Sequence, residues 1–189
     1  MSFRTGVLNI VIGSNKVTAL VEDIQANIRE KSVVFSYWTT SLNLVERAVK
    51  EANIGYVRFD GSVSSKNREL ALHRLHHDLS VRVILITVSC GAVGLDLTAA
   101  SRAYLLEPQW NPTTEEQALA RIHRMGQERP VTTIRFIMRR SFEEHVMKVQ
   151  DRKRELADLI FSGGRSSGAE QTQARLSVRN LPKVSTTFS

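Results

Sequence analysis

The side chains with the most distinctive chemistry lie between residues 115 and 127, in the sequence EEQALARIHRMGQ. If this segment is helical, Gln117, Arg121 and Arg124 have i, i+4, i+7 spacing and project from one face. Two guanidinium groups and an amide cannot pack in an apolar core, and planar guanidinium groups suit bidentate contacts with phosphate oxygens. The pattern therefore indicates a phosphate-binding helix face, although an ordinary solvated basic surface has the same spacing.

A second candidate segment is residues 87–98, TVSCGAVGLDLT, which directly follows the apolar run 81–86. Gly91 and Gly94 would let the backbone approach a ligand closely at the carboxyl end of a strand, where open α/β sheets bind ligands. Glycines at this spacing are also compatible with a simple tight turn. Cys90 is the only cysteine, which excludes an internal disulfide and fits a reducing compartment, and we expect it to be chemically inert.

Three histidines, His73, His76 and His77, fall on one predicted helix. The i, i+3, i+4 spacing could bring two imidazoles near a metal ion. No carboxylate or cysteine pattern completes such a site, so we expect a solvated helix face and no metal ion.

Alternating strand and helix patterns surround these segments. Apolar, β-branched runs predict strands at 32–37, 55–59, 81–87, 102–106 and 131–136, and helical periods predict helices at 16–29, 41–52, 64–77, 113–125 and 141–161. Asn111 and Pro112 form a helix start, as do Ser141 and Glu144. This alternation is typical of an α/β fold with a central, mainly parallel sheet covered by helices on both faces.

The charge of the chain favours polyanionic partners. Its 189 residues carry 26 Lys and Arg against 19 Asp and Glu, a formal net charge of +7. Residues 121–154 alone hold ten basic and four acidic side chains. The chain is long enough to bury a core without disulfides or a metal. The early apolar stretch 7–12 is far shorter than the roughly 20 residues that a bilayer span needs, so we expect no membrane partner.

Taken in order, several motifs together resemble one family. They are KSVVFSYW at 31–38, FDGS at 59–62 with Arg68, GAVGLDLTAA at 91–100, EPQWNP at 107–112 and QALARIHRMGQ at 117–127. The whole resembles the second, C-terminal helicase lobe of Swi/Snf-type ATP-dependent DNA translocases, and is most similar to their DNA-repair branch. The resemblance implies a RecA-like three-layer lobe over residues 14–161, with an N-terminal extension at 1–13 and a disordered tail at 162–189.

The resemblance also implies roles at a nucleotide site. Arg121 and Arg124 match the arginines that reach the γ-phosphate of ATP held by the first lobe, and Gln117 matches the residue that orients them. Gly94 and Asp96 match the motif that touches ATP. Asp96 stands where the family usually has asparagine, while both arginines are retained.

On the DNA side, Ser36, Thr87 and Trp110 match positions that contact or position the backbone of double-stranded DNA. The helix at 141–160 resembles the segment that braces the two lobes. By the same resemblance we expect a nuclear location and a setting of DNA repair or chromatin remodelling.

Two motifs that ATP hydrolysis needs are absent from these 189 residues. There is no Gly-x-x-x-x-Gly-Lys-[Ser/Thr] phosphate loop and no Asp-Glu dipeptide to hold magnesium and water. We expect both on a first lobe, in cis or in trans, and expect this chain alone to bind ATP weakly without turning it over. The alternatives are a non-catalytic DNA-binding or regulatory module that pairs or competes with a separate first lobe, and an unrelated α/β nucleotide-binding protein.

Overall fold

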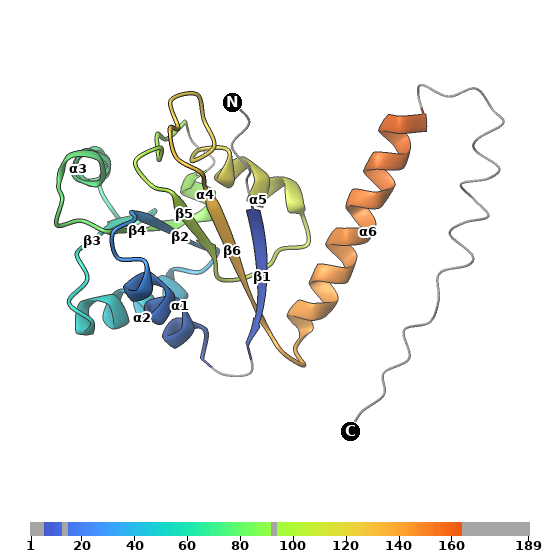
Figure 1. The fold of residues 1–189 in the computed structure, drawn as a ribbon, viewed down its shortest axis with the longest axis horizontal. Helices are drawn as coiled ribbons and strands as arrows, with labels where there is room; N and C mark the ends of the chain where they lie inside the picture. Colours follow the sequence, from blue (N-terminus) through green and yellow to red (C-terminus); the bar gives the residue numbers. More distant parts are fainter. Residues whose placement is uncertain (1–5, 13–14, 92–93, 164–189) are drawn as a thin grey trace. The chain divides into compact units, whose positions relative to one another are not determined.

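The computed structural model describes residues 6–12, 15–91 and 94–163 (Figure 1). Its strands are β1 (Gly6–Ile12), β2 (Ser32–Ser36), β3 (Tyr56–Phe59), β4 (Val83–Thr87), β5 (Arg102–Leu105) and β6 (Thr132–Met138). Its helices are α1 (Lys16–Ala26), α2 (Thr39–Glu51), α3 (Ser65–His77), α4 (Val88–Gly91), α5 (Pro112–Leu119) and α6 (Phe142–Gly163). The chain divides into two units, residues 1–150 and 151–189.

The strands of the first unit form one sheet in the order β1-β6-β5-β2-β4-β3, and every described pairing is parallel. Each of the five predicted strands is present within a few residues. The register pairs Ser36 with Thr87, so the carboxyl ends of β2 and β4 lie side by side. The predicted α/β fold with a parallel central sheet is therefore confirmed.

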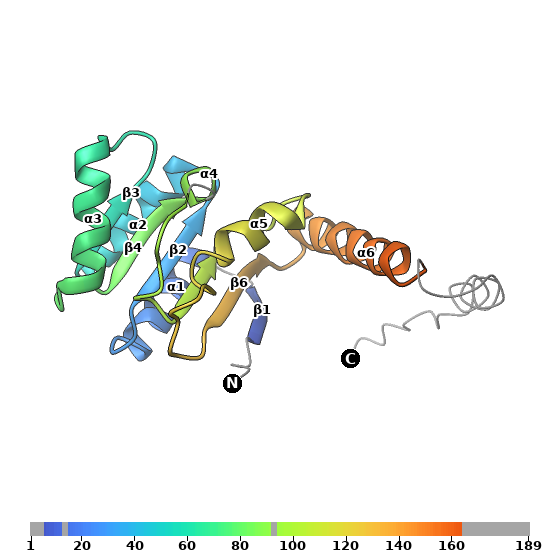
Figure 2. The same ribbon diagram turned by 90° about the horizontal axis from the view of Figure 1, so that it is seen from above.

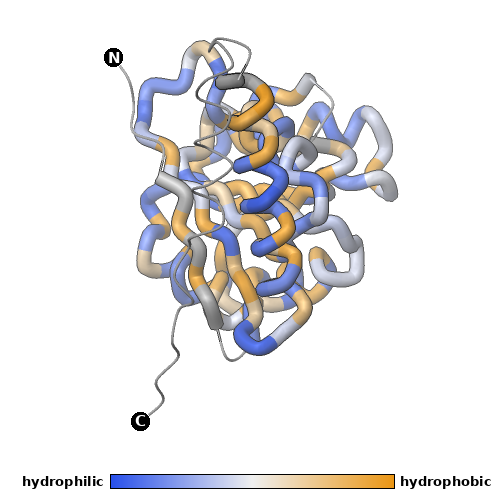
Figure 3. The backbone as a smooth tube through the Cα atoms, turned by 90° about the vertical axis from the view of Figure 1, so that its right-hand side faces the viewer, coloured by the Kyte–Doolittle hydropathy of each residue, from blue (hydrophilic) through white to orange (hydrophobic). Residues whose placement is uncertain are grey.

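Two hydrophobic cores fill the two faces of this sheet, whose strands and surrounding helices are seen from above in Figure 2. Successive side chains of a strand point to opposite faces, so Val33 and Phe35 belong to one core and Val34 to the other. The first core includes residues of α3 and α5, and the second includes residues of α1 and α2. Hydrophobic and hydrophilic stretches alternate along the backbone tube, as this layered burial requires (Figure 3).

The strand β1 is the largest addition to the predicted elements. Residues 6–12, expected to lie in an N-terminal extension, pair with β6 along their whole length, from Gly6 with Thr132 to Ile12 with Met138. Most of the predicted tail at 162–189 lies outside the described residues. The boundary of the lobe at 14–161 stays a prediction.

The last helix, α6, begins in the first unit and continues into the second. At its start the Ser141 hydroxyl accepts the N–H of Glu143 (3.1 Å), and the Glu144 carboxylate accepts the N–H of Arg140 (3.0 Å). In the second unit, Leu156, Leu159 and Ile160 recur at helical spacing between charged residues. Within the described part of the chain, no helix is long and apolar enough to cross a bilayer.

Candidate functional site

The helix that carries Gln117 ends earlier than its sequence predicts. Asn111 caps α5 by accepting the N–H of Thr113 (3.2 Å), and Pro112 occupies its first turn, as expected. The helix ends at Leu119, after which the N–H groups of Arg121 and Ile122 bond three residues back, and the carbonyl of Arg121 accepts the N–H of Leu97 (3.2 Å). The prediction that Gln117, Arg121 and Arg124 share one helix face is therefore wrong.

Both arginines lie instead in the turn that follows, residues 120–127, which we call the arginine turn. Gln127 pins this turn by donating from Nε2 to the carbonyls of Thr98 (3.1 Å) and Ala100 (2.9 Å). Gly126 has a φ of 103°, a conformation that side chains with a Cβ rarely adopt. Gln127 was not predicted as a site residue, although it closes the most distinctive motif of the sequence.

The arginine turn lies against the loop at 94–98. Asp96 accepts hydrogen bonds from the hydroxyl (2.6 Å) and N–H (3.0 Å) of Thr98, and these bonds lower its pKa below the ordinary 3.8. The positive charges of His76 and Arg124 lower this pKa further. Arg124 is exposed, and its guanidinium makes no hydrogen bond or ion pair with any described residue. The predicted residues Asp96 and Arg124 are thus brought together.

Gly94 precedes Asp96 and faces open space. A Cβ built at Gly94 meets no described atom within 4 Å, so packing inside the chain does not demand a glycine there. Gln117 is exposed on α5, one turn before the arginines. The neighbouring Ala92 and Val93 lie outside the described residues.

The predicted DNA-facing residues lie at the carboxyl ends of the strands. Ser36 is fully buried, and its hydroxyl donates to the carboxylate of Glu107 (2.9 Å) and accepts the N–H of Trp38 (3.0 Å). Thr87 is 5 % exposed and accepts a hydrogen bond from Ser89. Both hydroxyls are thus engaged within the protein, so Ser36 holds Glu107 and the Trp38 backbone in position.

Trp110 offers an accessible surface at the same end. It is 41 % exposed and forms edge contacts with the rings of Phe142 (5.2 Å between centroids) and His145 (6.0 Å) on α6. The indole is therefore packed against α6 in part and exposed in part. Of the three predicted DNA-facing residues, Trp110 is the one with substantial surface.

A buried polar cluster fixes the start of α5. The Glu115 carboxylate pairs with the Arg135 guanidinium (2.6 Å) and accepts the side-chain amide of Gln150 (2.9 Å) and the N–H of Gln109 (2.8 Å). Glu115 lies in the first turn of α5, and its side chain is 1 % exposed. No local pattern in the sequence marks its partner on β6.

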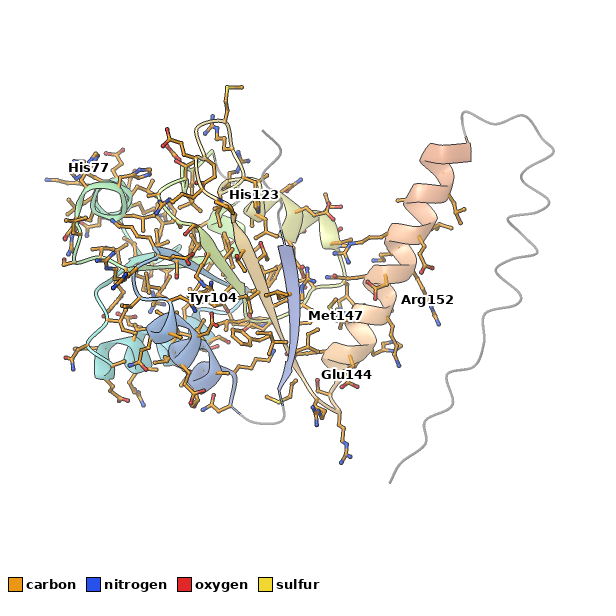
Figure 4. All side chains as sticks on the ribbon, in the orientation of Figure 1. His77, Tyr104, His123, Glu144, Met147 and Arg152 are labelled. Atoms are coloured by element: carbon orange, nitrogen blue, oxygen red, sulfur yellow. The ribbon has the colours of Figure 1, made fainter. Side chains whose placement is uncertain are left out.

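His123 lies in the arginine turn, and burial lowers its pKa below the ordinary 6.5 (Figure 4). The unfolded chain regains the ordinary pKa, so it binds more protons than the folded chain as the pH falls through 6.5. Stability is therefore present above pH 6.5 and lost on acidification towards the folded pKa. We expect His123→Gln to reduce the drop in melting temperature between pH 7.5 and pH 5.5.

The matched control is His77→Gln at the exposed end of α3 (Figure 4), which should keep the parent's pH dependence. A His123→Gln protein whose melting temperature drops as much as the parent's would contradict the assignment.

A magnesium ion at the candidate nucleotide site would need several oxygen ligands close together. Within residues 6–12, 15–91 and 94–163, no three His, Cys, Asp or Glu side chains are grouped so that they could hold a metal ion. The rings of His73 and His77 lie against each other, 4.6 Å apart, with no carboxylate completing a site. Asp96, in the loop that lies against the arginine turn, is already engaged by Thr98. The described residues therefore do not fit Mg²⁺.

Comparisons with known proteins agree with this arrangement. Residues 15–126 match the family model of the helicase conserved C-terminal domain. The chain is 40% identical over 156 residues to the DNA repair protein RAD5A of Arabidopsis thaliana, which covers 82% of the chain and 15% of that protein. It is 36% identical over 175 residues to the human helicase-like transcription factor, covering 89% of the chain and 17% of that protein.

Among solved structures, the C-terminal part of the Fun30 ATPase domain superposes with a TM-score of 0.69 at 26% identity. That match covers 72% of this chain and 45% of the other. The chain spans less than a fifth of the length of the two curated relatives. The match to the helicase C-terminal domain model nevertheless covers more than half of the chain, and this is sufficient to assign the chain to a family. The chain belongs to the helicase C-terminal domain family, among the Swi/Snf-type DNA repair helicases.

Proposed function

We propose that this chain is the second lobe of a DNA-dependent ATPase and translocase, acting in DNA repair or chromatin remodelling in the nucleus. It would supply arginines for ATP hydrolysis and part of the track for the DNA backbone. The phosphate loop and the magnesium ligands would come from a first lobe, because the 189 residues contain no phosphate loop. The names of two relatives, a DNA repair protein and a helicase-like transcription factor, agree with this setting.

The observation that carries the proposal is the position of Arg124. Its guanidinium is exposed beside Asp96, while the backbone around it is held by Gln127 and by the Leu97–Arg121 hydrogen bond. A rigid backbone that presents a free cation suits a group that stabilises charge on phosphate held by another lobe. Arg121 would share this role, and Gly94, Asp96 and Gln117 would border the nucleotide.

The carboxyl ends of β2 and β4 would form the DNA track. Ser36 and Thr87 are buried, which favours a role in positioning backbone groups near the DNA, with Trp110 providing the open contact surface. A partly exposed aromatic side chain can pack against sugar or base atoms without reading sequence. Such contacts, together with cationic side chains, give binding that does not depend on DNA sequence.

We expect the chain to bind duplex DNA with an affinity that falls steeply as salt rises. If it neutralises about three phosphates, a slope of about 0.9 per phosphate lowers the affinity roughly 40-fold between 50 and 200 mM salt. Fluorescence anisotropy with a labelled 20-base-pair duplex measures this slope. Trp110→Ala should lower the affinity at every salt concentration and leave the slope unchanged, because the indole contacts no phosphate through charge.

A flat salt dependence would instead favour a regulatory module whose partner is a protein. The same preparation should show weak ATP binding and no turnover when no first lobe is added. DNA-stimulated turnover by the chain alone, lost on Arg124→Ala, would overturn the proposed division of labour between two lobes.

A further inference from the structure

A pocket of about 420 Å³ lies at the opposite end of the sheet from Ser36 and Thr87, and no part of the proposed function uses it. We infer that this amino-end pocket binds phosphate groups of a multiply charged anion. The residues that line the amino-end pocket are Arg29, Lys31, His76, Leu79, Arg82, Thr98, Ala99 and Arg129. The volume falls within the roughly 300–1,000 Å³ of common ligand pockets.

The parallel sheet places the basic side chains of this pocket at one end of its strands. Lys31 immediately precedes β2 and Arg82 immediately precedes β4, while Arg129 lies three residues before β6. Parallel strands start at the same end of the sheet, so these side chains, far apart in the sequence, come from one end of it: β2 and β4 are neighbours, and β5 separates β2 from β6. Arg29, two residues before Lys31, adds a fourth cation.

The pocket has no carboxylate in its lining to balance this charge. Arg129 donates to the carbonyl of Ala99 (2.6 Å), and Arg82 donates to the carbonyl of Arg29 (3.4 Å). The Arg29 side chain makes no hydrogen bond or ion pair with another described residue. Three guanidinium groups are thus oriented by backbone carbonyls or left open to solvent, and each retains donors for an anion.

Lys31 adds a further positive charge to the pocket lining. It is 8 % exposed, and its Nζ donates to the carbonyls of Leu75 (2.5 Å) and Asp78 (2.9 Å). Burial lowers its pKa, and the charges of Arg82 and Arg129 lower it further against the opposing charge of Asp78, so two guanidinium groups lie close enough to repel the Lys31 ammonium. An anion in the pocket would relieve this repulsion.

Phosphate is the chemistry that best fits this lining. Planar guanidinium groups bind two phosphate oxygens at once, and several of them around one concave surface favour an anion with more than one phosphate. Two sources carry this group, the backbone of a nucleic acid and a small soluble polyphosphate. His76, in the lining, also contacts the carbonyl of Asp96 (3.2 Å), so an occupied pocket would lie next to the 94–98 loop.

The test uses the 189-residue chain and inorganic tripolyphosphate, with binding followed by isothermal titration calorimetry. The double variant Arg29→Ala, Arg82→Ala should bind tripolyphosphate at least tenfold more weakly than the parent. The matched control, Arg47→Ala, Lys50→Ala, removes the same charge from exposed positions on α2 and should stay within twofold. If the first double variant does not fold, Arg29→Glu, at an exposed position, should give the same loss.

A 20-base-pair duplex titrated into the same variants separates the two sources. A parallel loss of DNA affinity identifies backbone phosphates, and unchanged DNA affinity identifies a small polyphosphate; both outcomes support the pocket. No saturable tripolyphosphate binding, or an equal loss in the control, would overturn the proposal. So would a loss of tripolyphosphate binding in Arg124→Ala, because the probe would then occupy the nucleotide site.

Discussion

Replacing Arg124 with alanine should lower DNA-stimulated ATP turnover by roughly 10³–10⁵-fold once the chain is combined with a first lobe. The transferred phosphoryl group develops charge that a positioned guanidinium stabilises, and the arginine turn presents Arg124 exposed on a backbone held by Gln127. The assay measures phosphate release at saturating duplex DNA, with the chain fused to the first lobe of a Swi/Snf relative.

Two further variants sharpen this test. Arg139→Ala removes an exposed arginine from the turn after β6 and should leave turnover near the parent level. Arg124→Lys should restore little activity, because an ammonium group lacks the planar fork that binds two oxygens. Turnover by Arg124→Ala within tenfold of the parent would remove Arg124 from the mechanism, while the DNA affinity of the same variant reports whether the fold persists.

The largest expected loss of stability follows from Glu115→Ala, at about 3–5 kcal/mol of unfolding free energy. The Glu115–Arg135 pair is buried, with side chains 1 % and 5 % exposed, so removing the carboxylate leaves a guanidinium charge in the interior with less compensation. The same change also takes the acceptor from Gln150 and from the N–H of Gln109. Urea unfolding followed by circular dichroism measures the difference.

The control for this variant is an exposed ion pair. Arg74→Ala breaks the i, i+4 pair with Asp78 on α3 and should cost no more than about 1 kcal/mol. The double variant Glu115→Leu, Arg135→Met should be more stable than Glu115→Ala, since an apolar pair leaves no buried charge. Equal stability of Glu115→Ala and the parent would show that Glu115 does not position α5.

The fold could be predicted from the sequence because its signals are local. Apolar runs such as 83–87 are hydrophobic on both faces, which only a strand covered on both sides requires, and each predicted strand was found within a few residues. The edge strand β1 escaped prediction because its pairing with β6 joins residues more than 120 positions apart. Local patterns carry no information about such a partner.

The candidate site could be predicted only in part, because local motifs are visible in the sequence and contacts between distant residues are not. The family motifs assign Asp96 and Arg124 to a nucleotide site, and in the structure the charge of Arg124 acts on the Asp96 carboxylate. The end of α5 at Leu119 could not be predicted, because the helical periodicity of the sequence continues through Arg124, whereas the residues after Leu119 form a turn that contacts Leu97. Likewise, the burial of Glu115 depends on Arg135 and Gln150, which lie 20 and 35 residues further along the chain.

The pairing of β1 with β6 decides which strand forms the open edge of the sheet. β6 is a seven-residue strand with a largely buried, apolar sequence, and β1 covers the backbone edge that β5 leaves unpaired. A chain shortened to begin at residue 14 would keep every family motif but would expose the N–H and C=O groups along that edge. Such an edge is a template for strands of other molecules. Residues 6–12 therefore move the open edge of the sheet from β6 to β1, and they complete the sheet only after its last strand has been synthesised.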